Sequence, residues 1–254
     1  MLRAIRRWFS GRAAPAVQWP EVQAWCAQSR LAWEPLGDGQ GFAVENPSGP
    51  LAWRLEWGRP ERLYVRGRGE MRMQADLGLA PELHLMVLDG SLQQALERAV
   101  LDQIASDADS RFDPHMPLEM RWVVTFPRLA LQQAITWPAG LEAFASHQEW
   151  LLGWVSGPLA RALDAAPARG HSPLLLLIAE GRLQLRTGLD EPTVQRLQAW
   201  RTLFECAMHE ARRVHREMGE PEDPSTVPSL WAMSPGVETT DDGREATPGH
   251  ARPR

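Results

Sequence analysis

The chain has 254 residues, of which 44% are hydrophobic and 23% are charged, a balance typical of a globular protein with a sizeable core. All 27 basic residues are arginines, which excludes chemistry that needs a lysine, such as a P-loop phosphate contact or a Schiff base. The net charge of −5, with no long arginine stripe, predicts that nucleic acid is not a partner.

Cysteine usage narrows the possible sites further. Cys26 and Cys206 are the only two cysteines, too few for a cysteine-based zinc module, an iron–sulfur cluster or a disulfide framework. Unpaired cysteines suit a reducing compartment. We therefore expect a cytoplasmic protein.

Residues 1–18 form a basic amphipathic segment with four arginines and no acid. On a helix, apolar side chains of residues 1–12 lie on one side and arginines crowd the remainder, which favours peripheral attachment to an anionic membrane surface. The residues expected at the membrane are Leu2, Arg3, Ile5, Arg6, Arg7, Trp8 and Phe9. The alternative is that this helix packs on the protein's own body or frays. No stretch approaches the ~18 apolar residues that would span a bilayer.

The next part of the chain predicts a short helix and then a meander of strands. The helix begins at Pro20 and ends near Arg30. Alternation between apolar and polar residues from 41 to 76 predicts three half-buried strands. Their connections are short and rich in glycine and proline, so an antiparallel meander is the simplest arrangement. The inward-facing residues expected are Phe42, Val44, Trp53, Leu55, Trp57, Met71, Met73 and Ala75.

Further strands and helices follow. We expect a strand at 83–88, then a helix that Asp89, Gly90 and Ser91 begin. Residues 118–126 alternate without a break and predict the clearest strand in the chain. A long helix is expected over 139–163, bent or divided at Gly157 and Pro158.

The last elements are a hairpin and a helix. Strands at 174–179 and 183–187 are expected to join at a turn formed by Glu180 and Gly181. The final helix is expected from 191 to 218, with a stripe made of Leu197, Trp200, Phe204, Ala207, Ala211 and Val214.

These patterns together predict an α+β fold, in which an antiparallel meander sheet is followed by mixed strands and three main helices pack on the sheet. Two lobes are an option, namely 19–105 (meander and helix) and 106–218 (α+β). Residues 219–254 are acidic and proline-rich, and they predict a disordered tail. Most of the 12 tryptophans are expected in the core.

Charges of both signs occupy the polar sides of the meander strands: Glu45, Arg54, Glu56, Arg72 and Asp76. Opposite charges on neighbouring strands usually form solvent-exposed cross-strand pairs. The alternative is a surface that binds a charged partner.

Three carboxylates and an imidazole gather within residues 107–115, namely Asp107, Asp109, Asp113 and His115. These are suitable ligand types for a divalent cation, but their spacing matches no known metal site, and polar loops are common for solvation reasons alone. A second cluster, Cys206, His209 and Glu210, lies within one turn of the final helix. Zinc would need another ligand from elsewhere, and ordinary surface residues are the simpler interpretation.

Two functional hypotheses remain. The preferred one is a non-enzymatic interaction or scaffold protein with a protein partner, held near the inner membrane surface by residues 1–12. No catalytic residue and no cofactor is predicted under this hypothesis. The alternative is a divalent-metal-dependent enzyme that uses the 107–115 loop.

Overall fold

The computed structural model describes residues 18–37, 39–47, 51–65, 67–106, 116–167 and 173–219. In chain order the elements are α1 (Pro20–Ser29), β1 (Ala32–Pro35), β2 (Phe42–Asn46), β3 (Trp53–Gly58), β4 (Glu70–Asp76), β5 (Leu85–Asp89), α2 (Gly90–Ser106), α3 (Leu118–Thr125), η2 (Leu131–Gln133), β6 (Leu141–Ala145), α4 (Gln148–Val155), α5 (Pro158–Asp164), β7 (Leu174–Ala179), β8 (Arg182–Gly188) and α6 (Val194–Met218).

The eight strands form one antiparallel sheet in the order β1-β2-β3-β4-β8-β7-β5-β6. The predicted meander is confirmed as β2, β3 and β4, and each pairs with its neighbour in sequence. The C-terminal hairpin then enters the sheet between β4 and β5, because β8 pairs with β4 and β7 pairs with β5. Strands on both sides of residues 106–117 therefore belong to the same sheet.

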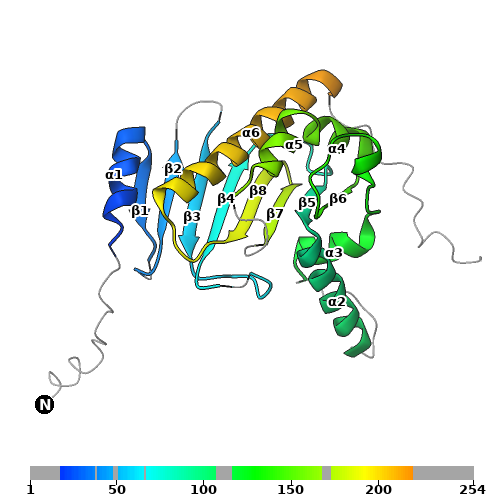
Figure 1. Cartoon of the computed structure of the whole chain (residues 1–254), viewed down its shortest axis with the longest axis horizontal. Helices are drawn as coiled ribbons and strands as arrows, with labels where there is room; N and C mark the ends of the chain where they lie inside the picture. Colours follow the sequence, from blue (N-terminus) through cyan, green and yellow to red (C-terminus); the bar gives the residue numbers. More distant parts are fainter. Residues whose placement is uncertain are drawn as a thin grey trace, which may run out of the picture. The chain divides into compact units, whose positions relative to one another are not determined.

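The predicted α+β class is confirmed, and helices pack against the sheet (Figure 1). The two hydrophobic clusters that they form contain alternate residues of β5 and β7, so they lie on opposite faces of the sheet. One face packs against α1, α4, α5 and α6 in a large hydrophobic cluster. The whole stripe predicted for the last helix is buried there. On the opposite face, α2 and α3 cover β5, β6 and β7 in a smaller cluster that includes Leu92, Leu96, Trp122, Leu175 and Leu177.

Local chemistry explains where several elements begin and end. Pro20 occupies the first turn of α1, where its missing N–H costs nothing, and Arg30 ends that helix in the left-handed conformation. Glu180 and Gly181 both have positive φ, 51° and 73°, as a two-residue hairpin turn requires. The hydroxyl of Thr193 accepts a hydrogen bond from the Arg196 N–H and caps α6.

The secondary structure predicted for two segments is wrong. Residues 118–126, expected as a strand, form helix α3, which buries Glu119, Trp122 and Val123. The alternating residues 118, 122 and 126 are also four apart, so the same pattern fits one side of a helix. Residues 141–145, expected within a long helix, form strand β6, which pairs with β5. Packing on both faces outweighs the helical preference of alanine and glutamate there.

The tryptophan prediction is confirmed for the described residues. Eight of the ten tryptophans in the described ranges are buried: Trp25, Trp53, Trp57, Trp122, Trp137, Trp150, Trp154 and Trp200. Trp154 donates its indole N–H to the Ala207 carbonyl at 2.9 Å, which ties α4 to α6. None of the helices in the described part of the chain combines the length and apolar composition needed to span a bilayer.

Candidate functional site

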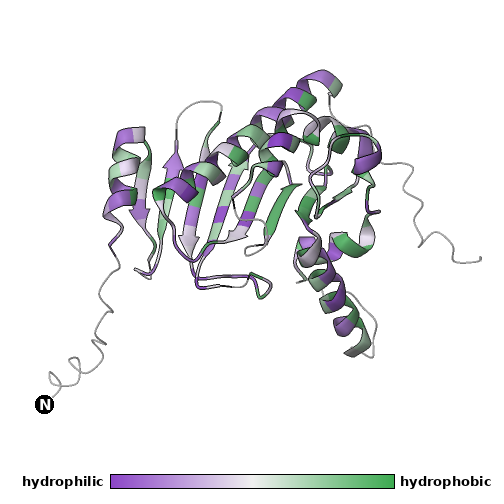
Figure 2. Cartoon of the chain, in the orientation of Figure 1, coloured by the Kyte–Doolittle hydropathy of each residue, from purple (hydrophilic) through white to green (hydrophobic). Residues whose placement is uncertain are grey.

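On one side of the strands β1–β4 and β8, none of the helices in the described ranges packs against the sheet, and we call this side the open face. Its polar side chains are Glu34, Glu45, Arg54, Glu56, Glu70, Arg72, Gln74, Asp76, Arg182, Gln184 and Arg186. Period-two alternation places them there, because the intervening residues of the same strands face the core. Figure 2 shows the contrast with β5 and β7, which are largely hydrophobic.

A continuous series of ion pairs crosses the open face, in which arginines and glutamates alternate. Arg54 binds Glu34 at 2.9 Å, Glu56 at 2.7 Å and also Glu45. Glu56 also binds Arg72 at 3.0 Å. The predicted cross-strand pairing of Glu45, Arg54, Glu56 and Arg72 is therefore present.

The series of ion pairs continues from β4 to β8 through Glu61. Arg72 binds Glu61, and Glu61 lies 3.4 Å from Arg186. Arg186 then binds Glu70 at 2.7 Å. Arg72 and Arg186 are directly opposite each other in the sheet register, so the carboxylates beside them offset the repulsion of two like charges.

The pKa shifts on this face all favour the charged forms. Burial acts against the charge of Arg54, but the hydrogen bonds that Arg54 donates to Glu56, Glu45 and Glu34 outweigh this effect and raise its pKa. Burial likewise opposes the charge of Arg186, and Glu70 raises its pKa. Burial would raise the pKa of Glu61, but its pairs with Arg72 and Arg186 lower it. A general acid or base needs a pKa near the working pH, whereas these shifts hold the three side chains in their charged forms.

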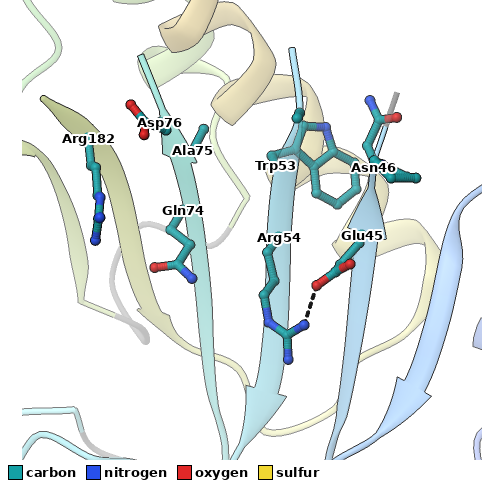
Figure 3. A pocket seen from close by; sticks show the side chains of 10 residues that line it. Glu45, Asn46, Trp53, Arg54, Gln74, Ala75, Asp76 and Arg182 are labelled. Atoms are coloured by element: carbon teal, nitrogen blue, oxygen red, sulfur yellow. Dashed lines mark hydrogen bonds and ion pairs between the residues drawn. The ribbon is translucent and has the colours of Figure 1, made fainter. Parts of the chain in front are cut away.

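A hollow of about 440 Å³ lies at one end of the open face (Figure 3). Arg182 and Asp76 come from adjacent strands there, and Gln74 and Arg54 lie further along the same face. Asn46 on the neighbouring strand donates to the Leu51 carbonyl. The lining of this hollow therefore combines hydrogen-bond donors with acceptors.

The connection between β3 and β4, residues 59–69, is anchored at several points, and we call it the clamped loop. The buried Glu70 accepts the Glu61 backbone N–H at 2.7 Å. The buried Glu119 of α3 accepts the Tyr64 hydroxyl at 2.6 Å and pairs with Arg62 at 2.9 Å. Burial and then Glu119 raise the pKa of Tyr64, so its hydroxyl stays protonated and donates.

Leu63 is fully exposed between these anchored neighbours. The Val65 N–H donates to the Arg62 carbonyl at 3.0 Å, which closes a turn around Leu63, and Val65 is buried. Figure 1 shows the loop extending beyond the strand ends. The structure therefore holds one large apolar side chain out into solvent on an ordered support.

The outer edge of β1 is poorly suited to adding a further strand. The Leu36 N–H points toward β2, where it donates to the Gly41 carbonyl. Backbone groups alternate in direction along a strand, so those of Trp33 and Pro35 point away from β2, toward the outer edge. Proline has no N–H to donate, and the Leu31 N–H is already bound to the Cys26 carbonyl of α1.

The remaining candidate residues from the sequence fall into two groups. Asp107, Asp109, Asp113 and His115 lie outside the described residues, as do residues 1–17 with the expected membrane contacts. Within the described ranges, no three metal-ligating side chains come together.

The helix α6 cluster is described, and its members have separate roles. Glu210 is buried and binds Arg213 at 2.8 Å, whereas His209 is exposed. Burial and then Glu210 raise the pKa of Cys206, which keeps its thiol protonated. Burial raises the pKa of Cys26 to about 11. Neither cysteine has the lowered pKa that a nucleophilic thiol needs.

Sequence patterns missed Glu119, Tyr64 and Leu63. Glu119 falls in the segment expected as a strand, and its partner Tyr64 is 55 positions earlier in the chain. The one available signal was a lone tyrosine in a polar loop beside an apolar residue. Comparison of the chain with protein-family models, curated proteins and solved structures gives no match.

Proposed function

We propose that the protein is an interaction module that binds a protein partner through the open face and the clamped loop. The observation that carries this proposal is the fully exposed Leu63, whose neighbours on both sides are held by contacts to buried groups. A loop that is already ordered loses little conformational entropy on binding, which favours affinity.

The chemistry of the surface indicates the kind of partner. Leu63 fits an apolar pocket, and its burial would contribute about 1.5–3 kcal/mol. Glu61, two residues before Leu63, and Glu34 on β1 are more than half exposed and remain able to accept hydrogen bonds, although each already pairs with an arginine. A partner with an apolar pocket, surrounded by charges of both signs, would match this surface, and the charges would set orientation and specificity.

Position-specific photocrosslinking in the native cell tests the proposal. A benzophenone amino acid at position 63 is expected to capture a single protein species, and the same group at position 101 is the control. Leu101 is also an exposed leucine, but it lies on α2. Equal capture from both positions, or none from position 63, would contradict the proposal.

Substitution provides the quantitative test. Leu63→Asp should weaken partner binding by about 10- to 100-fold, which corresponds to the burial energy of one leucine. Stability should change by less than about 0.5 kcal/mol, because the side chain makes no packing contact to lose. Leu101→Asp is the matched control and should leave binding unchanged.

A cytoplasmic location, with peripheral attachment through residues 1–12, belongs to the same proposal. Its support is the basic amphipathic pattern of that segment and two cysteines that are free in the structure. Flotation of the full chain with anionic liposomes tests attachment. Equal recovery of the full chain and a chain without residues 1–12 would remove this part of the proposal.

A further inference from the structure

A groove of about 370 Å³ lies where helices α1 and α6 begin, and none of the open face residues lines it. Its lining combines apolar side chains with acids: Gln18, Trp19, Pro20, Glu21, Val22, Asp190, Glu191, Pro192 and Thr193. Trp19 is half-buried and packs edge-on against Trp57, with ring centres 4.8 Å apart. The groove therefore has an apolar floor and carboxylates on both helix starts.

Among the described residues, no arginine forms an ion pair with the acids of this groove. Glu21 and Glu191 are exposed, and neither makes an ion pair within the described residues. Asp190 accepts the Arg68 backbone N–H at 2.5 Å, a neutral donor that leaves its negative charge in place. None of the lining residues is basic. This combination fits a ligand that is both cationic and apolar.

The chain supplies such a ligand directly before the groove. Residues 1–17 contain four arginines and no acid, together with Leu2, Ile5, Trp8 and Phe9. They join the groove at Gln18, which itself lines it. Because of this tether, the segment has an effective concentration in the millimolar range at the groove. Even a weak intrinsic affinity would then suffice for occupancy.

We propose that the groove is a binding site for a basic amphipathic peptide segment, and that its occupant is residues 1–17 of the same chain. Occupancy of the groove does not depend on the proposed function, whereas its consequence for lipid binding rests on the membrane attachment proposed above. A segment bound in the groove has its apolar side chains withheld from lipid. The groove therefore opposes membrane attachment through residues 1–12.

Limited trypsin digestion of the full chain tests this proposal. Because the chain has no lysine, trypsin cleaves only after arginines, and cleavage after Arg12 can be followed by mass spectrometry. Neutralising the groove with Glu21→Gln and Glu191→Gln should speed that cleavage at least about 5-fold, since the bound segment is released. Raising the salt concentration should speed it in the wild type as well.

The matched control is Glu149→Gln combined with Asp102→Asn. Glu149 occupies the first turn of α4 as Glu21 occupies that of α1, and both control residues are exposed. This variant should be cleaved after Arg12 at the wild-type rate. Trp8→Ala with Phe9→Ala removes the apolar half of the segment and should again speed cleavage.

Two results would overturn the proposal. One is an equal cleavage rate after Arg12 in the wild type and the Glu21→Gln, Glu191→Gln variant. The other is protection that grows with protein concentration, because the segment would then occupy the groove of a second copy. Circular dichroism of each variant verifies that faster cleavage does not come from unfolding.

Discussion

Replacing Tyr64 with phenylalanine tests whether the clamped loop is held as the structure shows. The substitution removes only the hydroxyl that donates to Glu119 at 2.6 Å, and Glu119 is almost completely buried. A hydrogen bond to a charged group contributes about 1.5–3 kcal/mol, and its loss leaves the buried carboxylate with one donor fewer. The free energy of unfolding should fall by that amount.

Urea unfolding followed by tryptophan fluorescence measures this change. With a slope of about 2 kcal/mol per molar urea, the midpoint should fall by about 1 M. In a double-mutant cycle, Tyr64→Phe should cost little once Glu119→Gln is present, because the shared interaction is already weakened. A loss below about 0.5 kcal/mol for Tyr64→Phe alone would refute the idea that this contact anchors the loop.

Tyr64 also provides a spectroscopic test, because it is the only tyrosine. Its pKa in the fold is raised above the ordinary 10.0 by burial and then by Glu119, so the unfolded chain releases the proton first. Stability is therefore fully present below pH 10 and is lost as the pH rises above it. Phenolate absorbance should appear together with unfolding, and its appearance in the folded protein near pH 10 would contradict the contact.

Three further predictions concern the remainder of the fold. Burial and then His147 lower the pKa of His84, so the unfolded state gains a proton first as the pH falls. Stability should therefore fall as the pH drops below 6.5. His84→Gln should reduce that dependence in thermal melts between about pH 7.5 and 5.5. Trp154→Ala should cost about 3–5 kcal/mol in urea unfolding, because the side chain is fully buried, and a cost below about 1 kcal/mol would contradict its place in the core. Glu180→Asn should raise the melting temperature by a few degrees, because asparagine tolerates the left-handed conformation at φ 51° better than glutamate, and an unchanged or lower value would count against the turn geometry.

The meander, the C-terminal hairpin and the last helix were predictable because each has one buried side. In β3, Trp53, Leu55 and Trp57 face the core while Arg54 and Glu56 do not, so period-two alternation is visible in the sequence. In α6 the buried positions follow the helical period in the same way. Local pattern and tertiary burial agree in these elements.

Local pattern failed where burial was not one-sided. Strand β6 buries Ala143 on one face of the sheet and Phe144 on the other, so no alternation marks it, and its composition favours a helix. Strand β1 has only four residues and its side chains are mostly exposed. In α3, contacts with α2 and with Tyr64 determine a conformation that the sequence pattern left ambiguous.

Of the candidate site, the sequence predicted only where some of the charged side chains lie and that they pair. Alternation placed Arg54 and Arg72 on a polar side, and opposite charges on neighbouring strands predicted their pairing. The continuation through Glu61 and Arg186 depends on β8 joining β4, a pairing between segments more than 100 residues apart. Sequence patterns carry no local signal for such a contact, nor for the burial of Glu70 beneath the clamped loop.

Hydrogen exchange measured on the protein, free and with its crosslinked partner, tests the central claim most directly. Binding through the open face and the clamped loop should slow exchange of the amides at 59–69 and of those in β3, β4 and β8, with no change in α4 and α5. Slowing confined to α4, α5 or α6, with exchange at 59–69 unchanged, would contradict the account.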